Sequence, residues 1–496
     1  MAAATAAATT RNSDHILIFP FMAKGHTIPL IDLTKSLLHL GLKVTFITTP
    51  SNQPFILSSL PTTSPLLHIT TLPFPTSPSL PSLCESTDHL PSPDLYPTFL
   101  NLTKNLSRPF HALLQNLSSS SQLPLCVISD FFMGWTLDSC RAFGVPRLVS
   151  HGMSVFSMSI CKSLWAHGPA WPNDGPFSVP GAPEHLRFTI ADLPLTVRCV
   201  DPDNPVVRFL AETGEADAQS WGVIVNSFDG LDGDYAGLFE SYYRAGSRAW
   251  FVGPLLFGCS GVGGDESGPD VARVTEWLDR RADGSVLYVS FGTQAHVSDA
   301  QLDEIARGLE LSAWDFVWAV RSGSWAVPDG VEGKGLILRG WAPQRLVLAH
   351  RATGGFMSHC GWNSVLESVS AGVLMLAWPM IAEQPLNAKF VVDELRAGLR
   401  IPTGWPEDSG FIVERAVIAE RVKELMGGEK GGIVRSRARE LGEGAKRAVQ
   451  PGGSSNVSLS GLIDELRRGL DGTDESGESV WVTQHEWTQS TTTITL

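Results

Sequence analysis

Polar side chains are concentrated in one otherwise apolar stretch of the sequence, GFMSHCGWNSVLESVSAG at residues 355–372. His359 closes a pattern typical of a buried strand, and Asn363, Ser364 and Glu367 follow in the first turns of an expected helix. A buried polar group without a partner costs about 1–3 kcal/mol. These side chains therefore predict a polar ligand at the junction of strand and helix.

The expected helix start after Gly361 indicates what this ligand is. The first amides of a helix are free donors and carry about half a positive charge. Gly361 allows close approach, and His359, Asn363 and Ser364 add neutral donors, so the junction suits a phosphate. Glu367 lies one turn further on, where a carboxylate can accept hydrogen bonds from a diol such as ribose. Taken singly, each of these residues is more simply explained by packing or helix capping.

Two further residues, His26 in KGHTIP and Asp130 in LCVISD, lie at the carboxyl ends of expected strands. Ligands of open α/β sheets bind at such ends. A histidine near neutral pKa can take a proton from a hydroxyl, and a buried aspartate can orient the imidazole. On the residues alone, a helix-cap histidine and a loop acid remain the favoured interpretation.

An alternation of strand and helix patterns must position these residues. Strand patterns occupy residues 15–21, 42–49, 123–130, 145–150, 221–228, 284–293, 315–321, 335–343, 353–359 and 372–379. Helix patterns occupy residues 28–41, 135–144, 298–312, 413–428 and 454–470. Thr27 is the expected cap of the first helix, with Pro29 in its first turn, and Ser298 is the expected cap of helix 298–312. This alternation predicts an α/β fold of two doubly wound, Rossmann-like domains with parallel sheets.

The domain boundaries follow from composition. Residues 253–270, dense in Gly and Pro, are the expected linker between an N-terminal domain at 15–252 and a C-terminal domain at 271–470. Residues 1–14 are expected to be a flexible tail and residues 471–496 a disordered one. Residues 51–120, rich in Ser, Pro, Thr and Leu, predict loops and irregular helices in a variable pocket wall.

Bulk composition excludes several classes of function. The chain of 496 residues carries 37 basic and 51 acidic side chains, a net charge of −14, which disfavours nucleic-acid binding. The seven cysteines show no CxxC spacing, which favours reduced thiols and a cytoplasmic location. No run approaches the roughly 18 apolar residues of a membrane span. The acidic triplet DPD at 201–203 is too short a pattern to indicate a metal site.

The 44 residues from Trp341 to Gln384, WAPQRLVLAHRATGGFMSHCGWNSVLESVSAGVLMLAWPMIAEQ, resemble a known motif. They are similar in residues and spacing to the signature box of the plant secondary-product UDP-dependent glycosyltransferases. The resemblance implies an inverting enzyme of the two-domain GT-B fold. One departure is Leu374, where that family usually has proline; a local effect on the backbone is expected, without loss of chemistry.

The resemblance also implies which residues contact a UDP-sugar. The uracil base and the ribose would be held by Trp341, Ala342, Gln344 and Glu367. The phosphates would be held by Thr293, His359, Asn363 and Ser364. The sugar would be contacted by Trp362, Glu383 and Gln384. The physical interpretation of the junction agrees independently at the phosphates and at the diol.

For catalysis, the resemblance reverses the interpretation of His26 and Asp130, because the family uses such a pair as its catalytic dyad. His26 would deprotonate the acceptor hydroxyl, whose oxygen attacks the anomeric carbon opposite UDP, and charge on the diphosphate would be met by the helix start. The UDP-sugar is a co-substrate, and no metal or other cofactor is expected.

The acceptor is expected to be a small lipophilic alcohol, of phenolic or flavonoid type, bound by the first domain. Apolar segments at 130–135 and 151–157 suggest Phe131, Met133 and Phe156 as its contacts. Within the family, a glutamine at the position of Gln384 goes with glucose, so UDP-glucose is the expected donor. A monomer is the expected state.

Several alternatives remain open. The same scaffold can use UDP-rhamnose, UDP-xylose or UDP-galactose, or form glucose esters of carboxylic acids. A nucleotide-sugar-binding protein without turnover is a further alternative. A nicotinamide oxidoreductase ranks last, because no GxGxxG follows the first strand.

Overall fold

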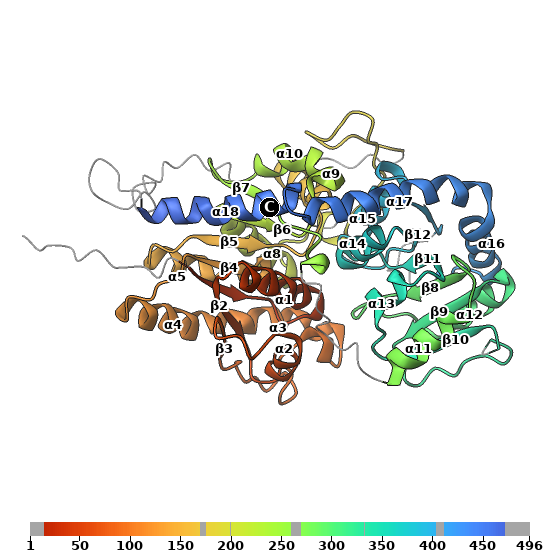
Figure 1. Cartoon of the computed structure of the whole chain (residues 1–496), viewed down its shortest axis with the longest axis horizontal. Coiled ribbons are helices and arrows are strands. Elements are labelled where there is room, and N and C mark those ends of the chain that lie inside the picture. Colours follow the sequence, from red (N-terminus) through yellow and green to blue (C-terminus); the bar gives the residue numbers. More distant parts are fainter. Residues whose placement is uncertain are drawn as a thin grey trace, which may run out of the picture.

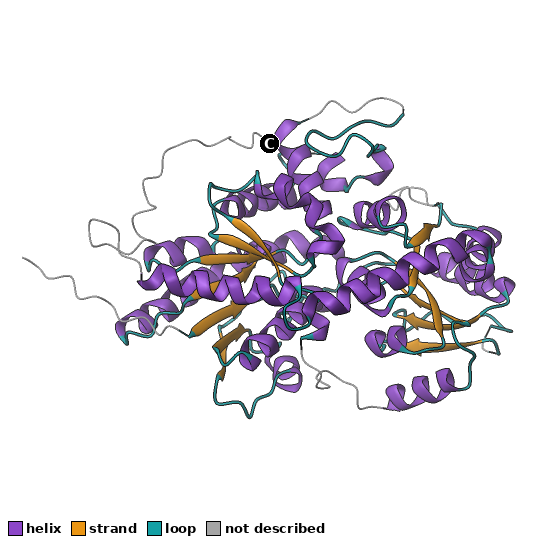
Figure 2. Cartoon of the chain, turned by 45° about the horizontal axis from the view of Figure 1, so that its top comes forward, coloured by secondary structure: helices purple, strands orange, loops and turns teal. Residues whose placement is uncertain are grey.

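The computed structural model describes residues 14–168, 175–198, 200–258, 269–331, 333–402 and 411–471. Within these ranges the chain forms two parallel sheets, each flanked by helices (Figure 1; Figure 2). The first sheet has the strand order β3-β2-β1-β4-β5-β6-β7 and the second β10-β9-β8-β11-β12-β13. In both sheets the order reverses beside the first strand, which is the arrangement of a doubly wound fold. The predicted fold class is confirmed.

The strands of the first sheet are β1 His15–Phe19, β2 Lys43–Thr48, β3 Leu67–Thr71, β4 Cys126–Asp130, β5 Arg147–Ser150, β6 Gly222–Val225 and β7 Arg248–Phe251. Those of the second are β8 Val286–Ser290, β9 Asp315–Val320, β10 Gly335–Arg339, β11 Thr353–Ser358, β12 Leu374–Ala377 and β13 Gly398–Arg400. Central strands such as β1, β4 and β11 are buried along their whole length because helices cover both faces.

The helices before the linker are α1 Lys24–His39, α2 Gln53–Ser59, α3 Tyr96–Thr103, α4 Ser107–Ser119, α5 Thr136–Ala142, α6 Val155–His167, α7 Leu195–Arg198, α8 Pro205–Ala218, α9 Asp229–Asp232 and α10 Ala236–Glu240. Those after it are α11 Pro269–Asp279, α12 Asp299–Ser312, α13 Gln344–Ala349, α14 Trp362–Ala371, α15 Gln384–Lys389, α16 Arg415–Gly427, α17 Glu429–Val449 and α18 Ser454–Asp471. Ser298 caps α12 as predicted, accepting a hydrogen bond from the amide of Gln301.

Helix α1 begins earlier than predicted, at Lys24, so that His26 lies in its first turn and not in a loop. Thr27 is not the cap, because its hydroxyl donates instead to the carbonyl of Phe21 at 3.2 Å. The amide of Lys24 is satisfied from a distant segment, by Oδ2 of Asp88 at 3.1 Å. A helix start that is capped by a remote carboxylate leaves no local signal in the sequence.

Residues 51–120 contain more regular structure than predicted. The short edge strand β3 and the helices α2, α3 and α4 all fall in this segment. Between β3 and α3 the chain is irregular, as predicted, with short 3₁₀ turns at Thr87–His89 and Pro93–Leu95.

The last helix corrects the expected boundary of the second domain at residue 470. Helix α18 returns to the first sheet, where Leu462 and Leu466 join the core that contains Ile16 of β1 (Figure 1). The guanidinium of Arg467 pairs with Asp14 at 2.6 Å. The first domain is therefore completed by the C-terminal end of the described chain. Helix α11 begins at Pro269, within the last two residues of the expected linker, and most of this linker lies outside the described residues, as do nearly all of both expected tails.

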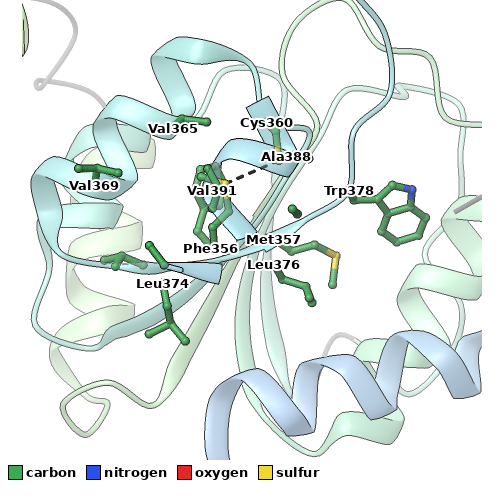
Figure 3. Close-up of a cluster of buried hydrophobic side chains, with 14 of the residues drawn as sticks. Phe356, Met357, Cys360, Val365, Val369, Leu374, Leu376, Trp378, Ala388 and Val391 are labelled. Atoms are coloured by element: carbon green, nitrogen blue, oxygen red, sulfur yellow. Dashed lines mark hydrogen bonds between the residues drawn. The ribbon is translucent and has the colours of Figure 1, made fainter. Parts of the chain in front are cut away.

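The core of the second domain holds the junction of β11 and α14 in place. Phe356 and Met357 of β11 pack in one cluster with Val365 and Val369 of α14 (Figure 3). Leu374, the departure from the family pattern, is buried in this cluster as the first residue of β12. The strand end and the helix start are thus fixed by packing on several sides.

Candidate active site

Two residues predicted as a dyad meet at the carboxyl edge of the first sheet. Nδ1 of His26 lies 2.7 Å from Oδ2 of Asp130, the last residue of β4. The other oxygen of Asp130 accepts a hydrogen bond from the amide of Phe132 at 2.9 Å, and the carboxyl is 1% exposed. With Nδ1–H donating to the carboxylate, the lone pair of the imidazole resides on Nε2, the nitrogen that a base requires.

Aromatic rings surround His26. The ring centroids of Phe21 and Phe132 lie 5.5 and 5.4 Å from that of His26 in edge-to-face geometry. Gly152, with φ of +67°, lies behind the imidazole, where an added Cβ would be 3.6 Å from Nδ1. Burial disfavours the charged imidazolium, but Asp130, together with the charges of Glu383 and Asp88, outweighs burial and raises the pKa of His26 above its ordinary value.

The junction of β11 and α14 has the predicted geometry, since α14 begins at Trp362 with Gly361 as its cap. Burial lowers the pKa of His359 to about 4, so that its imidazole is neutral. Glycines permit the packing around it: an added Cβ at Gly292 or Gly361 would lie 2.5 or 2.6 Å from Nε2 of His359. In the described structure, Nδ1 of His359 and Oδ1 of Asn363 are buried without a hydrogen-bond partner, as expected of a polar site. Thr293 follows Gly292 in the turn after β8.

Asn363 joins the two domains. Its Nδ2 donates to the carbonyl of Gly25, in the first turn of α1, at 2.6 Å. In a regular helix this carbonyl would accept from the amide of residue 29, but residue 29 is proline and has no N–H. Pro29 therefore leaves Gly25 free to hold a side chain of the donor half beside His26.

A second set of residues surrounds Glu367 of α14. Nε2 of Gln344 donates both to Oε2 of Glu367 at 2.7 Å and to the hydroxyl of Ser364 at 2.9 Å. Nε of Arg345 donates to Oε1 of Glu367 at 2.9 Å. One hydrogen-bonded group thus contains Gln344, Ser364 and Glu367, which were predicted to contact the base, the phosphates and the ribose. Arg345, which also belongs to this group, was not predicted.

Trp341 and Ala342 precede this group, directly before α13. The indole of Trp341 is 47% exposed, an unusual exposure for tryptophan, and the ammonium of Lys24 lies 4.4 Å from the indole centroid. An exposed indole plane next to the Gln344 group is a suitable surface for stacking a flat base. Ala342 is 9% exposed.

The side chain of Trp362 is not positioned to contact a sugar. The indole is 2% exposed, and its N–H donates to the carbonyl of Asn226 in the first domain at 3.0 Å. This side chain joins the domains. A contact of Trp362 with a sugar would therefore be made by its backbone amide, at the start of α14.

Glu383 and Gln384 lie at the start of α15. The side-chain carbonyl of Gln384 accepts from the amides of Met380 and Ile381 at 3.0 and 2.9 Å and shapes the preceding loop. Burial raises the pKa of Glu383, against the opposing charge of His26. The side chains of His26 and Glu383, from different domains, thus interact electrostatically.

Asn387 of α15, which the sequence did not single out, connects this loop to the first domain. Its amide nitrogen donates to Oε1 of Glu383 at 3.1 Å and to the carbonyl of Cys360 at 2.9 Å. Its carbonyl accepts from the hydroxyls of Ser154 and Ser157, which lie at the start of α6. An asparagine within a helix carries no signal of such a role in one sequence.

The expected acceptor residues are more deeply buried than predicted. Met133 and Phe156 are both 0% exposed, and Phe156 stacks on Phe390 at a centroid distance of 4.7 Å. Phe131 is 2% exposed and stacks on His151. Their packing is that of core residues, because no face of Met133 or Phe156 is left uncovered. Phe132, which follows Phe131 in the chain, lies instead beside His26, with 5.4 Å between the ring centroids.

Other candidate features do not converge on a site. The acidic triplet at 201–203 forms a turn, in which the amide of Asp203 donates to the side chain of Asp201 at 2.9 Å. Among the described residues, no group of three or more His, Cys, Asp or Glu side chains is arranged to hold a metal ion. In the same ranges no helix combines the length and the apolar character needed to cross a membrane.

Known proteins are similar to this chain over most of its length. Residues 254–402 match the family described as UDP-glucoronosyl and UDP-glucosyl transferase. The chain is 37% identical over 489 residues to UDP-glycosyltransferase 73B4 of Arabidopsis thaliana, covering 92% of this chain and 99% of the relative. It is 35% identical over 475 residues to scopoletin glucosyltransferase of Nicotiana tabacum, covering 91% and 98%.

Solved structures are similar over the same length. UGT73P12 of Glycyrrhiza uralensis, complexed with glycyrrhetinic acid 3-O-monoglucuronide, has a TM-score of 0.82 at 31% identity, covering 92% of this chain and 96% of that one. UGT2 of Phytolacca americana, complexed with UDP-2fluoro-glucose and pterostilbene, has a TM-score of 0.77 at 28% identity, covering 91% and 99%. Identity of this extent over more than 90% of the chain shows that the chain belongs to the plant UDP-dependent glycosyltransferases of the GT-B fold.

Proposed function

We propose that the protein is an inverting UDP-glucose-dependent O-glucosyltransferase whose acceptor is a small phenol of flavonoid type. The observation that carries this proposal is the contact between the two halves of the site. The base His26 and the carbonyl of Gly25, which holds Asn363 of the donor half, lie in the same first turn of α1. An acceptor activated by His26 is thereby next to the start of α14.

The reaction then needs one displacement. Nε2 of His26 accepts the proton of the acceptor hydroxyl, and the oxygen forms a bond to the anomeric carbon. The bond from that carbon to the diphosphate breaks, and UDP leaves with the electron pair. Attack opposite the leaving group converts an α-linked donor into a β-glycoside. The amides at the start of α14 and the side chain of Asn363 stabilise the charge that develops on the diphosphate.

The remaining contacts are assigned by position. Trp341 stacks on uracil, Gln344 contacts the base, and Glu367 accepts the ribose hydroxyls. Glu383 and Gln384 contact the sugar. The aromatic rings of Phe21 and Phe132 beside His26 favour a flat, lipophilic acceptor. Relatives named scopoletin glucosyltransferase and anthocyanin 3'-O-beta-glucosyltransferase support a glucose donor and a phenolic acceptor.

A product assay tests this proposal. The purified protein is incubated with a panel of phenols and flavonoids and with UDP-glucose, UDP-galactose, UDP-xylose and UDP-rhamnose, each in turn. Mass spectrometry identifies the products, and the NMR coupling of the anomeric proton gives the linkage. Turnover with UDP-glucose above the other donors, and a β-linked product, are expected. An α-linked product contradicts the inverting mechanism, and preference for another donor contradicts the assignment of glucose.

A further inference from the structure

Besides Asn363, the guanidinium of Arg345 connects the donor half of the site to α1, the helix that carries His26. Arg345, the second residue of α13, donates through Nη2 to Oδ2 of Asp32 at 2.7 Å and through Nε to Oε1 of Glu367 at 2.9 Å. Asp32 lies on α1 and Glu367 on α14. Arg345 therefore bridges two carboxylates from different domains.

The burial of these carboxylates distinguishes the bridge from a surface ion pair. The side chains of Asp32 and Glu367 are 9% and 10% exposed. Burial disfavours the charge on Arg345, but the two carboxylates outweigh it and raise its pKa. By contrast, the pair of Arg351 and Asp283 in the same domain is 53% and 76% exposed, where ion pairs contribute little. The bridge thus joins two largely buried carboxylates through a guanidinium that is itself 38% exposed.

The hydrogen bonds on Glu367 leave room for a diol. Gln344 donates to Oε2 and Arg345 to Oε1, so that each oxygen accepts one hydrogen bond from this pair. A carboxylate offers about four acceptor positions, two on each oxygen. Both oxygens can therefore accept a further hydroxyl while the two donors fix the plane of the carboxylate.

We propose that Arg345 is a positioning residue of the donor site, which aims Glu367 at the ribose diol and ties it through Asp32 to the helix of His26. This inference rests on the proposed function, in which Glu367 accepts the ribose hydroxyls. It goes beyond that function by assigning a role to a residue outside the contacts with UDP-glucose. Guanidinium is suited to the role because its planar fork reaches two carboxylates at once, which a lysine ammonium cannot do with fixed geometry.

The test separates an effect on the diol from an effect on the fold. Calorimetry measures the binding of UDP and of 2′,3′-dideoxyuridine diphosphate, which lacks the diol, to the wild type and to variants. Arg345→Ala is expected to weaken UDP binding about tenfold, the loss of one charge-assisted interaction, and to leave the dideoxy compound within about twofold. Arg345→Lys is expected to fall between the wild type and the alanine variant. Arg351→Ala, the matched removal of an exposed ion pair, is expected to bind both compounds as the wild type does.

The contact between Arg345 and Asp32 is tested by a separate variant. Asp32→Asn keeps the contact between Arg345 and Glu367, so UDP binding is expected to change less than with Arg345→Ala. For glucosyl transfer, kcat is expected to fall, while KM for the donor changes less, because α1 is no longer connected through Arg345 to Glu367. If the ratio of kcat to KM in Asp32→Asn equals that of the wild type, the proposed role of Asp32 is overturned. If Arg345→Ala does not fold, Arg345→Lys carries the comparison of UDP with the dideoxy compound, and Asp32→Asn still tests the connection to α1.

Failure of this inference is distinguishable from failure of the proposed function. Glu367→Ala is expected to weaken UDP binding but not binding of the dideoxy compound. If Glu367→Ala has this effect and Arg345→Ala has none, the role of Arg345 is overturned and the site stands. If Arg345→Ala weakens both compounds equally, its role is structural, and the inference is again overturned. If Glu367→Ala has no diol-dependent effect, the assignment of the ribose site itself fails.

Discussion

Nδ1 of His26 and Oδ2 of Asp130 lie 2.7 Å apart, joining the first turn of α1 to the end of β4. The second oxygen of Asp130 is held by the amide of Phe132, so the carboxylate cannot rotate away from the imidazole without breaking that bond. The orientation of the His26 imidazole is thus determined by the fold of the first sheet.

Replacement of His26 by alanine removes the proton acceptor. For phenolic acceptors, His26→Ala is expected to lower kcat by roughly 10²–10⁴, the usual contribution of a general base. Carboxylic acid acceptors are already ionised and are expected to lose much less. Both rates are measured by chromatography of the glucosylated products. Equal losses for the two acceptor classes would show that His26 does not act as the base.

The pH dependence of turnover depends on Asp130. Its carboxylate raises the pKa of His26 above 6.5, so kcat/KM for a phenol is expected to fall as pH decreases through that raised pKa, where the imidazole becomes protonated. Asp130→Asn removes the charge, so the acidic limb is expected to move to lower pH, and the plateau to fall by roughly 10²–10⁴. A pH–rate profile of both proteins checks this. If the acidic limb of the profile does not move in Asp130→Asn, a different neighbour raises the pKa of His26.

Gly292 is expected to be essential for donor binding. Its φ is +74°, and an added Cβ would lie 2.5 Å from Nε2 of His359, so Gly292→Ala must displace the imidazole. UDP binding, measured by calorimetry, is expected to weaken tenfold or more, at about 1.4 kcal/mol for each factor of ten. Gly246→Ala is the control, since its φ is +86° but nothing lies within 4 Å of the added Cβ. That variant is expected to lose about 1–2 kcal/mol of stability with unchanged UDP affinity.

Helix α18 is expected to stabilise the first domain. Leu462 is 2% exposed in the core with β1, so Leu462→Ala is expected to cost about 2–5 kcal/mol. Val457→Ala, on the exposed face of the same helix, is expected to be nearly neutral. Hydrogen exchange at β1 and β7 reports the stability of this domain directly. Faster exchange confined to the second sheet would contradict the placement of α18.

The sequence predicted those parts of the site that depend on local patterns. The apolar run before His359, the glycine at 361 and the polar residues after it determine a strand, a cap and a helix within a few residues, and the structure agrees. The strand that ends at Asp130 was predicted for the same reason.

Features that depend on distant segments were missed. The start of α1 depends on Asp88, and α18 has its partners more than four hundred residues away in the chain, at Ile16. Arg345 lies in a short helix where a basic residue is typical of a solvated surface, and its two carboxylate partners become neighbours only when the domains meet. Met133 and Phe156 show the opposite error, because aromatic and apolar residues near a pocket cannot be separated from the core by composition.

Pro29 has a consequence for engineering. Because Pro29 has no N–H, α1 lacks the backbone hydrogen bond to the carbonyl of Gly25, and the side chain of Asn363 donates to that oxygen instead. A substitution such as Pro29→Ala, chosen to make the helix more regular and thus more heat-resistant, would give that oxygen a partner inside the helix. The amide of residue 29 and the side chain of Asn363 would then compete for one carbonyl oxygen. A gain in thermal tolerance at this position would therefore weaken the contact between the two domains.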